Sequence, residues 1–161
     1  MTQDLPKISD RYGADEIRSF YDAGYWTRET LLDLVDHWAD ERPDDVFVTD
    51  GTTALTFGQL REGAYRMAAG LARTGITDGD RVVVQLPSWT DFVTAAVAVA
   101  RCRAILVPIM PIYRNDEVAY ILRHSGARAV ITCKSFGGFD FAAMHNDIRG
   151  DCPRRGARYL A

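Results

Sequence analysis

The chain has 161 residues, a length that permits one domain with a buried core. Its formal net charge is −3, and acidic and basic residues are interspersed, so no basic surface of the kind that binds nucleic acid is predicted. The three cysteines, Cys102, Cys133 and Cys152, lie far apart. This spacing argues against a disulfide framework and a zinc site, and favours reduced thiols in a cytoplasmic protein.

No secretory or membrane-spanning segment is expected. Residues 1–10 contain no apolar run of the kind found in signal peptides. The longest apolar stretch, residues 92–110, is interrupted by Arg101 and Arg103, so a buried helix followed by a strand is predicted there.

The first 26 residues are predicted to form an N-terminal arm and a short helix over residues 14–23, which Gly24 ends. The residues expected on the inward face of this helix are Ile17, Phe20 and Tyr21. Trp26 is expected to pack against the body of the fold rather than to contact a ligand.

A second helix is predicted to begin after Thr27 or Thr30 and to extend to about Asp40. Its inward stripe is expected to consist of Leu31, Leu34, Val35 and Trp38. Residues 46–49 and 52–55 are then predicted to pair as an antiparallel hairpin, because the Asp50-Gly51 dipeptide between them favours tight turns.

The chain from residue 56 to residue 132 alternates between predicted helices and predicted strands. The expected helices cover about 56–73, 87–101 and 115–124, and the expected strands cover 81–86, 104–107 and 128–132. The runs 82–84 and 129–131 are apolar without polar alternation, which is typical of strands buried on both faces in a parallel sheet. Alternation of this kind predicts right-handed crossovers and a layered α/β fold.

The expected helix ends carry recognisable capping signals. Thr56 with Gln59, and Ser88 with Asp91, have the spacing of a capping box. The glycines expected to end helices in the left-handed conformation are Gly75 and Gly126. The inward face of the first of these helices is expected to consist of Phe57, Leu60, Ala64, Met67, Ala68 and Leu71. A further helix is predicted over residues 141–149.

On topology alone, residues 86–91 are the first candidate for a ligand site, because they join the carboxyl end of a strand to the start of a helix. Backbone amides at such a helix start favour anions. The alternative, which we prefer, is that Ser88 only caps the helix, since every such junction has this geometry and few bind ligands.

The sequence offers no recognisable catalytic, cofactor-binding or metal-binding residue. His37, His124 and His145 have no cysteine or serine partner at a recognisable spacing, so structural or surface roles are predicted. Gly137-Gly138 is not a dinucleotide fingerprint, and no phosphate-binding G-x-x-x-x-G-K-[S/T] loop occurs. No carboxylate pair stands at helical spacing beside an apolar wall.

Four segments in order resemble motifs of adenylate-forming enzymes. They are Leu55-Thr56-Phe57-Gly58-Gln59-Leu60, residues 79–87 (GDRVVVQLP), residues 101–108 (RCRAILVP), and residues 116–122 with 127–132. On these motifs the chain is identified as a member of the acyl-CoA synthetase and AMP-dependent ligase family, over roughly residues 24–151. Residues 108–114 look most like the branch that acts on acyl, alicyclic or aryl acids. Arg103 stands where the family usually has glycine, which argues against close packing at that turn.

The resemblance implies a reaction for the complete family enzyme, in which a carboxylic acid and ATP form an acyl-adenylate and the thiol of coenzyme A then displaces AMP. It also implies a Pro-Lys-Gly phosphate loop, an aromatic-Gly-x-Thr-Glu stretch for adenine and Mg²⁺, a ribose-binding aspartate and a C-terminal lysine. None of these is in this sequence. We therefore expect the N-terminal scaffold of an acid–CoA ligase, inactive alone and needing no cofactor alone, whereas ATP, Mg²⁺ and coenzyme A serve the full-length enzyme.

Three regions are predicted: an arm and short helix over 1–26, an α/β subdomain over 27–152, and a tail over 153–161 that is unlike the family. Three arginines and a glycine in the last eight residues make a poor buried strand. A change of reading frame near Pro153 is the resulting hypothesis, and translation of the DNA beyond Arg154 in all three frames tests it.

Two interpretations of function stay open. A truncated ligase scaffold should expose an apolar face and self-associate, and its only small-molecule partner would be a carboxylic acid bound by the complete enzyme. A free-standing α/β binding or regulatory module using residues 86–91 should melt cooperatively and bind an apolar dye weakly. An independent nucleotide-binding enzyme is disfavoured by the absent phosphate loops.

Overall fold

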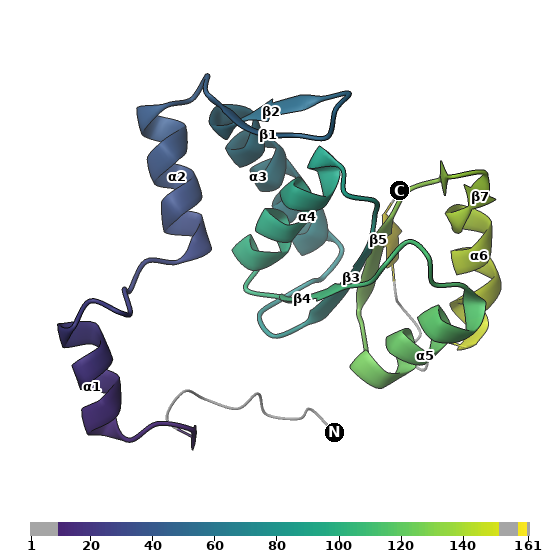
Figure 1. The fold of residues 1–161 in the computed structure, drawn as a ribbon. Helices are drawn as coiled ribbons and strands as arrows, with labels where there is room; N and C mark the ends of the chain where they lie inside the picture. Colours follow the sequence, from purple (N-terminus) through teal and green to yellow (C-terminus); the bar gives the residue numbers. More distant parts are fainter. Residues whose placement is uncertain (1–9, 152–157, 161) are drawn as a thin grey trace. The chain divides into compact units, whose positions relative to one another are not determined.

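The structure is a computed structural model that describes residues 10–151 and 158–160 (Figure 1). The chain divides into two compact units, residues 1–30 and residues 31–161. Among the described residues, no helix is both long enough and apolar enough to cross a membrane.

The first unit is built around helix α1 (Ala14–Asp22) and a cluster of aromatic rings. Trp26 lies with its ring centroid 5.4 Å from that of Tyr12, 4.8 Å from that of Phe20 and 5.8 Å from that of Tyr21. Trp26 therefore packs within the first unit, and its packing against the body of the fold stays a prediction. Gly24 follows α1 with φ of +74°, the left-handed conformation in which glycine ends helices.

The second unit contains the remaining elements. In chain order they are α2 (Leu31–Glu41), β1 (Val46–Thr49), β2 (Ala54–Thr56), α3 (Phe57–Arg73), β3 (Arg81–Gln85), α4 (Thr90–Arg101), β4 (Ile105–Pro108), α5 (Asn115–Ser125), β5 (Ala129–Thr132), β6 (Ser135–Phe136), β7 (Phe139–Asp140), α6 (Phe141–Asp147), the 3₁₀ turn η2 (Ile148–Asp151) and β8 (Arg158–Leu160).

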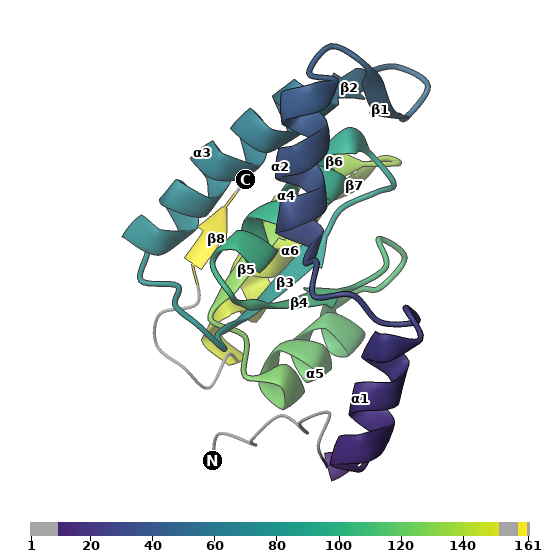
Figure 2. The ribbon, with the colours of Figure 1, turned by 90° about the vertical axis from the view of Figure 1, so that its left-hand side faces the viewer.

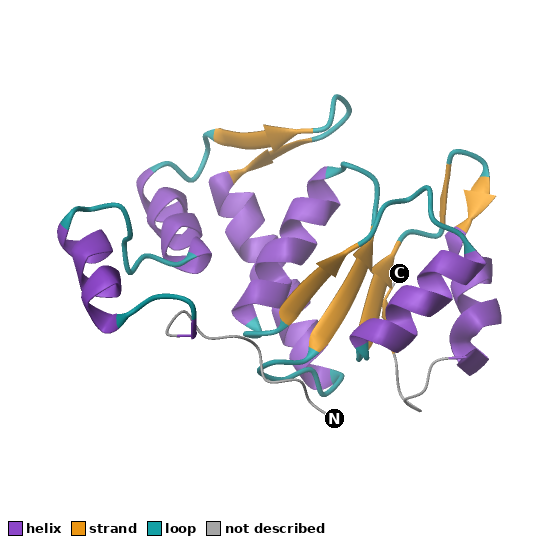
Figure 3. Cartoon of the chain, turned by 60° about the horizontal axis from the view of Figure 1, so that its bottom comes forward, coloured by secondary structure: helices purple, strands orange, loops and turns teal. Residues whose placement is uncertain are grey.

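A parallel sheet with strand order β4-β3-β5-β8 forms the centre of this unit. Helices cover both of its faces, as Figure 3 shows, which confirms the predicted layered α/β fold. Val82 and Val84 of β3 pack with α3 and α4, whereas Val83 between them packs with α5 and α6. All three valines are fully buried, as predicted for a strand covered on both sides.

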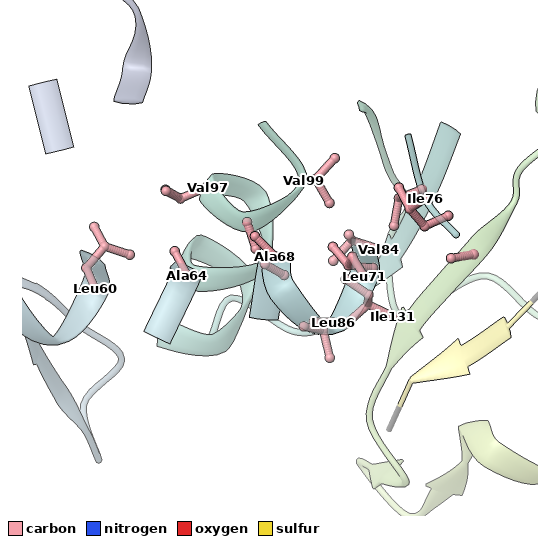
Figure 4. Close-up of a cluster of buried hydrophobic side chains, with 14 of the residues drawn as sticks. Leu60, Ala64, Ala68, Leu71, Ile76, Val84, Leu86, Val97, Val99 and Ile131 are labelled. Carbon is pink, nitrogen blue, oxygen red and sulfur yellow. The ribbon is translucent and has the colours of Figure 1, made fainter. Parts of the chain in front are cut away.

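The larger apolar core lies between α3, α4 and one face of the sheet. Leu71 of α3, Val84 of β3 and Ile131 of β5 gather at its centre in Figure 4. The predicted inward stripe of α3 is confirmed, since Leu60, Ala64, Ala68 and Leu71 are buried and Phe57 and Met67 are half-buried.

The capping box predicted at the start of α3 is present. The Gln59 amide donates to Thr56 Oγ1 at 3.2 Å, and Gln59 Oε1 accepts from the Thr56 amide at 3.0 Å. Gly75 and Gly126 end α3 and α5 with φ of +86° and +63°, as predicted.

The face that helix α2 presents to the core matches the predicted one only in part, since Val35 is buried and Trp38 half-buried as predicted. Leu31 and Leu34 are 50% and 43% exposed, so their assignment to the inward stripe was wrong. Val35 and Ala39 are buried, and Leu32 packs against the same core. The residues that face the core, Leu32, Val35 and Ala39, are therefore three and four positions apart. This is the spacing of a helix that packs on one side only.

The hairpin predicted from Asp50-Gly51 is present, with β1 antiparallel to β2, but its turn is longer than predicted. Thr49 pairs with Ala54, so residues 50–53 form the turn. A second hairpin, β6 with β7, was not predicted from the sequence. Its turn is Gly137-Gly138 with φ of +57° and +78°, the positive values that tight hairpin turns require.

The end of the chain differs from the sequence-based expectation in one respect. The last eight residues were expected to make a poor strand, yet β8 pairs in parallel with β5, beside which it lies in Figure 2. An edge strand needs only one neighbour, so charged residues are tolerated there better than in the centre of a sheet. The boundary at residue 153 and the change of reading frame stay predictions.

Arg103 is the only described residue other than glycine with positive φ, at +54°. It lies in the turn between α4 and β4, its carbonyl accepts from the Gly79 amide at 3.0 Å, and its exposed guanidinium lies 2.9 Å from Asp78 Oδ2. Arg103 therefore holds the left-handed conformation that glycine adopts at no steric cost.

Replacing Arg103 with glycine should relieve this backbone strain. The left-handed conformation costs a residue with a Cβ about 1–2 kcal/mol, and glycine loses about 0.5–1 kcal/mol more than alanine in chain entropy. Arg103→Gly should thus be more stable than Arg103→Ala by about 0.5–1 kcal/mol in urea unfolding. Both variants lose the ion pair with Asp78, so their difference isolates the backbone. Equal stability of the two would contradict the assignment of strain.

Candidate functional site

A hollow of about 520 Å³ opens where β3 and β4 end. Residues 86–89 form one wall and residues 108–111 form the opposite wall. Phe92 and Val93 of α4 and Val48 of β1 complete the lining, so the surface is largely apolar. We call this cavity the switch-point hollow. It includes four of the six residues, 86–91, that the sequence singled out on topology.

The position of the hollow follows from the connections of the sheet. Strands β3 and β4 are neighbours, but β3 leads into α4 on one face and β4 leads into α5 on the other. The two loops therefore separate at the carboxyl edge, which leaves a crevice between them. In open α/β sheets, ligands bind in crevices of this kind.

The start of α4 is not capped by Ser88, so that prediction was wrong. The N-cap residue is Trp89, which makes no side-chain capping bond. Instead, the Thr90 amide donates to Oδ2 of Asp50, in the β1–β2 turn, at 3.2 Å. A carboxylate from another element thus lies where the helix would attract an anion.

Asp50 is held as a carboxylate by four hydrogen bonds. Its Oδ1 accepts from the Thr53 amide at 2.8 Å, the Thr52 hydroxyl at 2.8 Å and the Thr52 amide at 3.0 Å. The bond from the Thr53 amide, followed by those from Thr52 and from Thr90, holds the pKa of Asp50 well below its usual range. The start of α4 therefore carries a negative charge at neutral pH.

A buried polar pair lies behind the 108–111 wall of the hollow. Gln85 and His145 are 0% and 1% exposed, and His145 Nε2 lies 2.8 Å from Gln85 Oε1. The Gln85 amide nitrogen donates to the carbonyls of Met110 and Tyr113, at 3.3 Å each. Because its nitrogen faces two carbonyls, Oε1 of Gln85 is the acceptor for the His145 ring N–H. The pair therefore ties the loop after β4 to helix α6.

Aromatic and cation–π contacts join the loops around the hollow. The Trp89 ring meets Phe136 of β6 edge to face, with centroids 5.5 Å apart. Arg114 lies with its guanidinium carbon 4.1 Å from the centroid of Phe139, and its Nη1 donates to the Pro111 carbonyl at 2.7 Å. These contacts hold the loops after β3, β4 and β5 against one another.

The other residues weighed in the sequence do not gather at the hollow. His37 and His124 are exposed, and His124 stacks on Tyr120 with centroids 5.5 Å apart. Cys102 and Cys133 are half-buried, and burial raises the pKa of both thiols. Cys152 lies outside the described residues.

Residues 10–151 and 158–160 contain no group of three or more His, Cys, Asp or Glu side chains that could hold a metal ion. The hollow itself is lined largely by apolar groups, and Asp50 occupies the first amide of the nearest helix, that of Thr90. The described residues therefore do not fit ATP phosphates or Mg²⁺, and we derive no step through either. The prediction that the chain carries no catalytic residue stays a prediction.

Sequence reasoning missed Asp50 and Gln85 as site residues. Asp50 was assigned only to a hairpin turn, and Gln85 only to a strand. The one signal in the sequence concerned Gln85, which is a glutamine at the end of an otherwise apolar strand. A buried amide of this kind needs hydrogen-bond partners.

Comparison with known proteins agrees with the fold and the motifs. The model of the AMP-binding enzyme family matches residues 35–158. This chain belongs to that family. The match covers β3, β4, β5, the helices α3 to α6 and the switch-point hollow, and it leaves out α1, the start of α2 and all but the first residue of β8.

The similar curated proteins are adenylate-forming acid ligases. A salicylyl-CoA synthase / salicylate adenylyltransferase of Streptomyces is 33% identical over 142 residues, 88% of this chain and 26% of that protein. A salicyl-AMP ligase / salicyl-S-ArCP synthetase of Mycobacterium tuberculosis is 34% identical over 147 residues, again 88% and 26%. The chain thus spans about a quarter of the length of the curated relatives that it matches.

Solved structures give the same result for the fold. MbtA of Mycobacterium smegmatis matches with a TM-score of 0.75 and 29% identity, over 88% of this chain and 26% of that one. The anthranilate CoA ligase AuaEII also matches with a TM-score of 0.75, at 21% identity, over 86% of this chain and 26% of that one. The fold of the second unit is therefore that of part of an adenylate-forming enzyme.

Replacing Gln85 with leucine should destabilise the second unit by about 2–4 kcal/mol, because two carbonyls and the His145 ring N–H would lose a buried partner. Thr132→Val is the matched control, since it removes only the hydroxyl that donates to the Gln85 carbonyl and should cost about 1 kcal/mol. Urea unfolding of both variants measures the difference. A smaller loss of stability for Gln85→Leu than for Thr132→Val would show that the Gln85 side-chain amide does not hold the loop after β4 in place.

Burial lowers the pKa of His145 from 6.5 to about 4. Between pH 6.5 and about pH 4, His145 therefore binds a proton in the unfolded chain but not in the folded chain. The contribution of neutral His145 to the free energy of unfolding is complete above pH 6.5. It is lost as the pH falls from 6.5 towards 4, by up to about 3 kcal/mol.

The variant His145→Gln keeps a donor for Gln85 but does not titrate. The stability of the wild type, measured by urea unfolding between pH 7 and pH 4.5, should fall more steeply than that of the variant. Parallel pH profiles would mean that His145 is accessible to protons in the folded protein.

Proposed function

We propose that this chain is the N-terminal scaffold of an ATP-dependent acid ligase and does not catalyse adenylation alone. Family membership over residues 35–158 supports the ligase assignment. The observation that carries the scaffold assignment is coverage, since relatives of this family are about four times as long as the matched part. The described residues also offer no metal-ligating group, and the sequence has no phosphate loop.

The acid handled by the complete ligase is proposed to be a small aromatic acid. The relatives' names specify salicylate and 2,3-dihydroxybenzoate, and both are hydroxylated benzoates. ATP, Mg²⁺ and an accepting thiol such as that of coenzyme A are proposed for the complete enzyme. The scaffold supplies a preformed α/β layer, and we propose that the groups that bind phosphate lie on other parts of the ligase.

The proposal also assigns the regions of the chain. Residues 27–152 are the scaffold itself, and residues 1–26 are an accessory arm with its own aromatic cluster around Trp26. Residues 153–161 are proposed not to contribute to the ligase fold beyond the edge pairing of β8.

A second candidate function, a free-standing binding module, is favoured by the switch-point hollow. The hollow lies at the topological position where α/β sheets bind ligands, and the described chain forms it without any other subunit. A sharp cooperative melt with weak binding of an apolar dye would favour this candidate over the scaffold.

ATP–pyrophosphate exchange with salicylate tests the scaffold proposal. The chain alone should give no exchange above background. A chimera in which residues 35–151 replace the matching segment of the Mycobacterium tuberculosis salicyl-AMP ligase should give exchange, because the fold and motifs of that segment are shared.

The matched control is the same chimera carrying Val83→Asp. Val83 is fully buried in the centre of the sheet, so an unpaired carboxylate there should unfold the scaffold and abolish exchange. Exchange by the chain alone would refute the claim that it is inactive. A folded but inactive chimera would refute the claim that it can serve as the scaffold.

A further inference from the structure

We propose that the switch-point hollow binds an uncharged aromatic ring, and that Asp50 excludes carboxylates from it. The inference is independent of whether the chain is a ligase scaffold, because it concerns only residues that the second unit itself brings together.

The lining of the hollow suits an aromatic ligand. Its volume of about 520 Å³ lies within the usual range of small-molecule sites. Trp89 and Phe92 offer aromatic surfaces on one side, and Pro108 and Pro111 offer apolar surfaces on the other. The contact between Trp89 and Phe136 fixes the orientation of the indole before any ligand arrives.

The walls are held apart by buried hydrogen bonds rather than by the ligand. Gln85 binds the carbonyls of Met110 and Tyr113, so the 108–111 wall cannot collapse onto Trp89 without breaking these bonds. Both Gln85 and its partner His145 are almost completely buried, so water does not readily replace the bonds. A preformed cavity binds a rigid ligand at a smaller cost in ordering.

The charge beside the hollow decides which ring it accepts. Val48, which lines the hollow, lies two residues before Asp50, and Trp89, which also lines it, directly precedes Thr90. The Asp50 carboxylate is bound to the Thr90 amide, so a negative charge stands beside the mouth. An entering carboxylate would be repelled, and the Thr90 amide is already bound to Asp50.

The test uses the full chain, labelled with ¹⁵N, and two probes of nearly equal shape, benzamide and benzoate. Benzamide should shift the indole N–H signal of Trp89 in a saturable way. At neutral pH, benzoate should bind at least about tenfold more weakly, because it differs chiefly in its negative charge.

Asp50→Asn tests the role of the charge. Asparagine suits the same turn and keeps one oxygen for the donors of Thr52 and Thr53, so the fold should persist although the Thr90 amide loses its acceptor. The preference for benzamide over benzoate should fall from at least about tenfold to less than about threefold. An unchanged preference would overturn the role assigned to Asp50.

Met110→Asp tests the location of the site. Met110 is 55% exposed and lines the hollow, so its replacement should be tolerated and should weaken benzamide binding about tenfold. Tyr120→Asp is the matched control, because Tyr120 is 59% exposed on α5 and does not line the hollow. Its affinity for benzamide should equal that of the wild type.

Three results would overturn the proposal as a whole. One is the absence of a saturable shift of Trp89 with benzamide. Another is binding of benzoate to the wild type within about threefold of benzamide. The third is an equal effect of Met110→Asp and Tyr120→Asp, which would place the probe elsewhere on the surface.

Discussion

The burial of β3 on both faces is the constraint on which the rest of the second unit depends. Val82 and Val84 fill the core beneath α3 and α4, and Val83 fills the core beneath α5 and α6. A strand that is buried on both faces needs helices on both sides of the sheet. Some connections between strands therefore run over one face, and others run over the opposite face. The neighbouring strands β3 and β4 then send their loops to opposite faces. The switch-point hollow is a consequence of this packing rather than a separate feature of the loops.

Gln85 extends the same strand into the polar layer at the sheet edge. A fully buried amide must find partners for both its oxygen and its nitrogen. Its oxygen is bound by His145 of α6 and its nitrogen by the loop after β4, so one side chain joins a helix on one face to a wall of the hollow. This arrangement explains why His145 is held neutral, since burial disfavours its charged form. Stability and the shape of the candidate site therefore depend on the same few hydrogen bonds.

The sequence predicted most of the fold, because most of it is set by local signals. The capping box of Thr56, the glycine ends at Gly75 and Gly126 and the apolar run through Val83 all act over a few residues. The face of α2 and the strand β8 were not predicted correctly, since packing against α3 and pairing with β5 decide them. The candidate site shows the same division. Its place at residues 86–91 followed from topology, but the bond between Asp50 and Thr90 joins positions 40 residues apart, which no local pattern reveals.

Asp50 also shows why a strand–helix junction is not by itself an anion site. The amides at a helix start attract a negative charge only while they lack a partner. In this chain a turn from a different hairpin supplies the charge, and its three further hydrogen bonds keep the carboxylate in place. At this junction Asp50 already occupies the first amide of α4, that of Thr90. Local chemistry and the quarter-length coverage of the relatives both support the proposal that the groups that bind phosphate lie on other parts of the ligase.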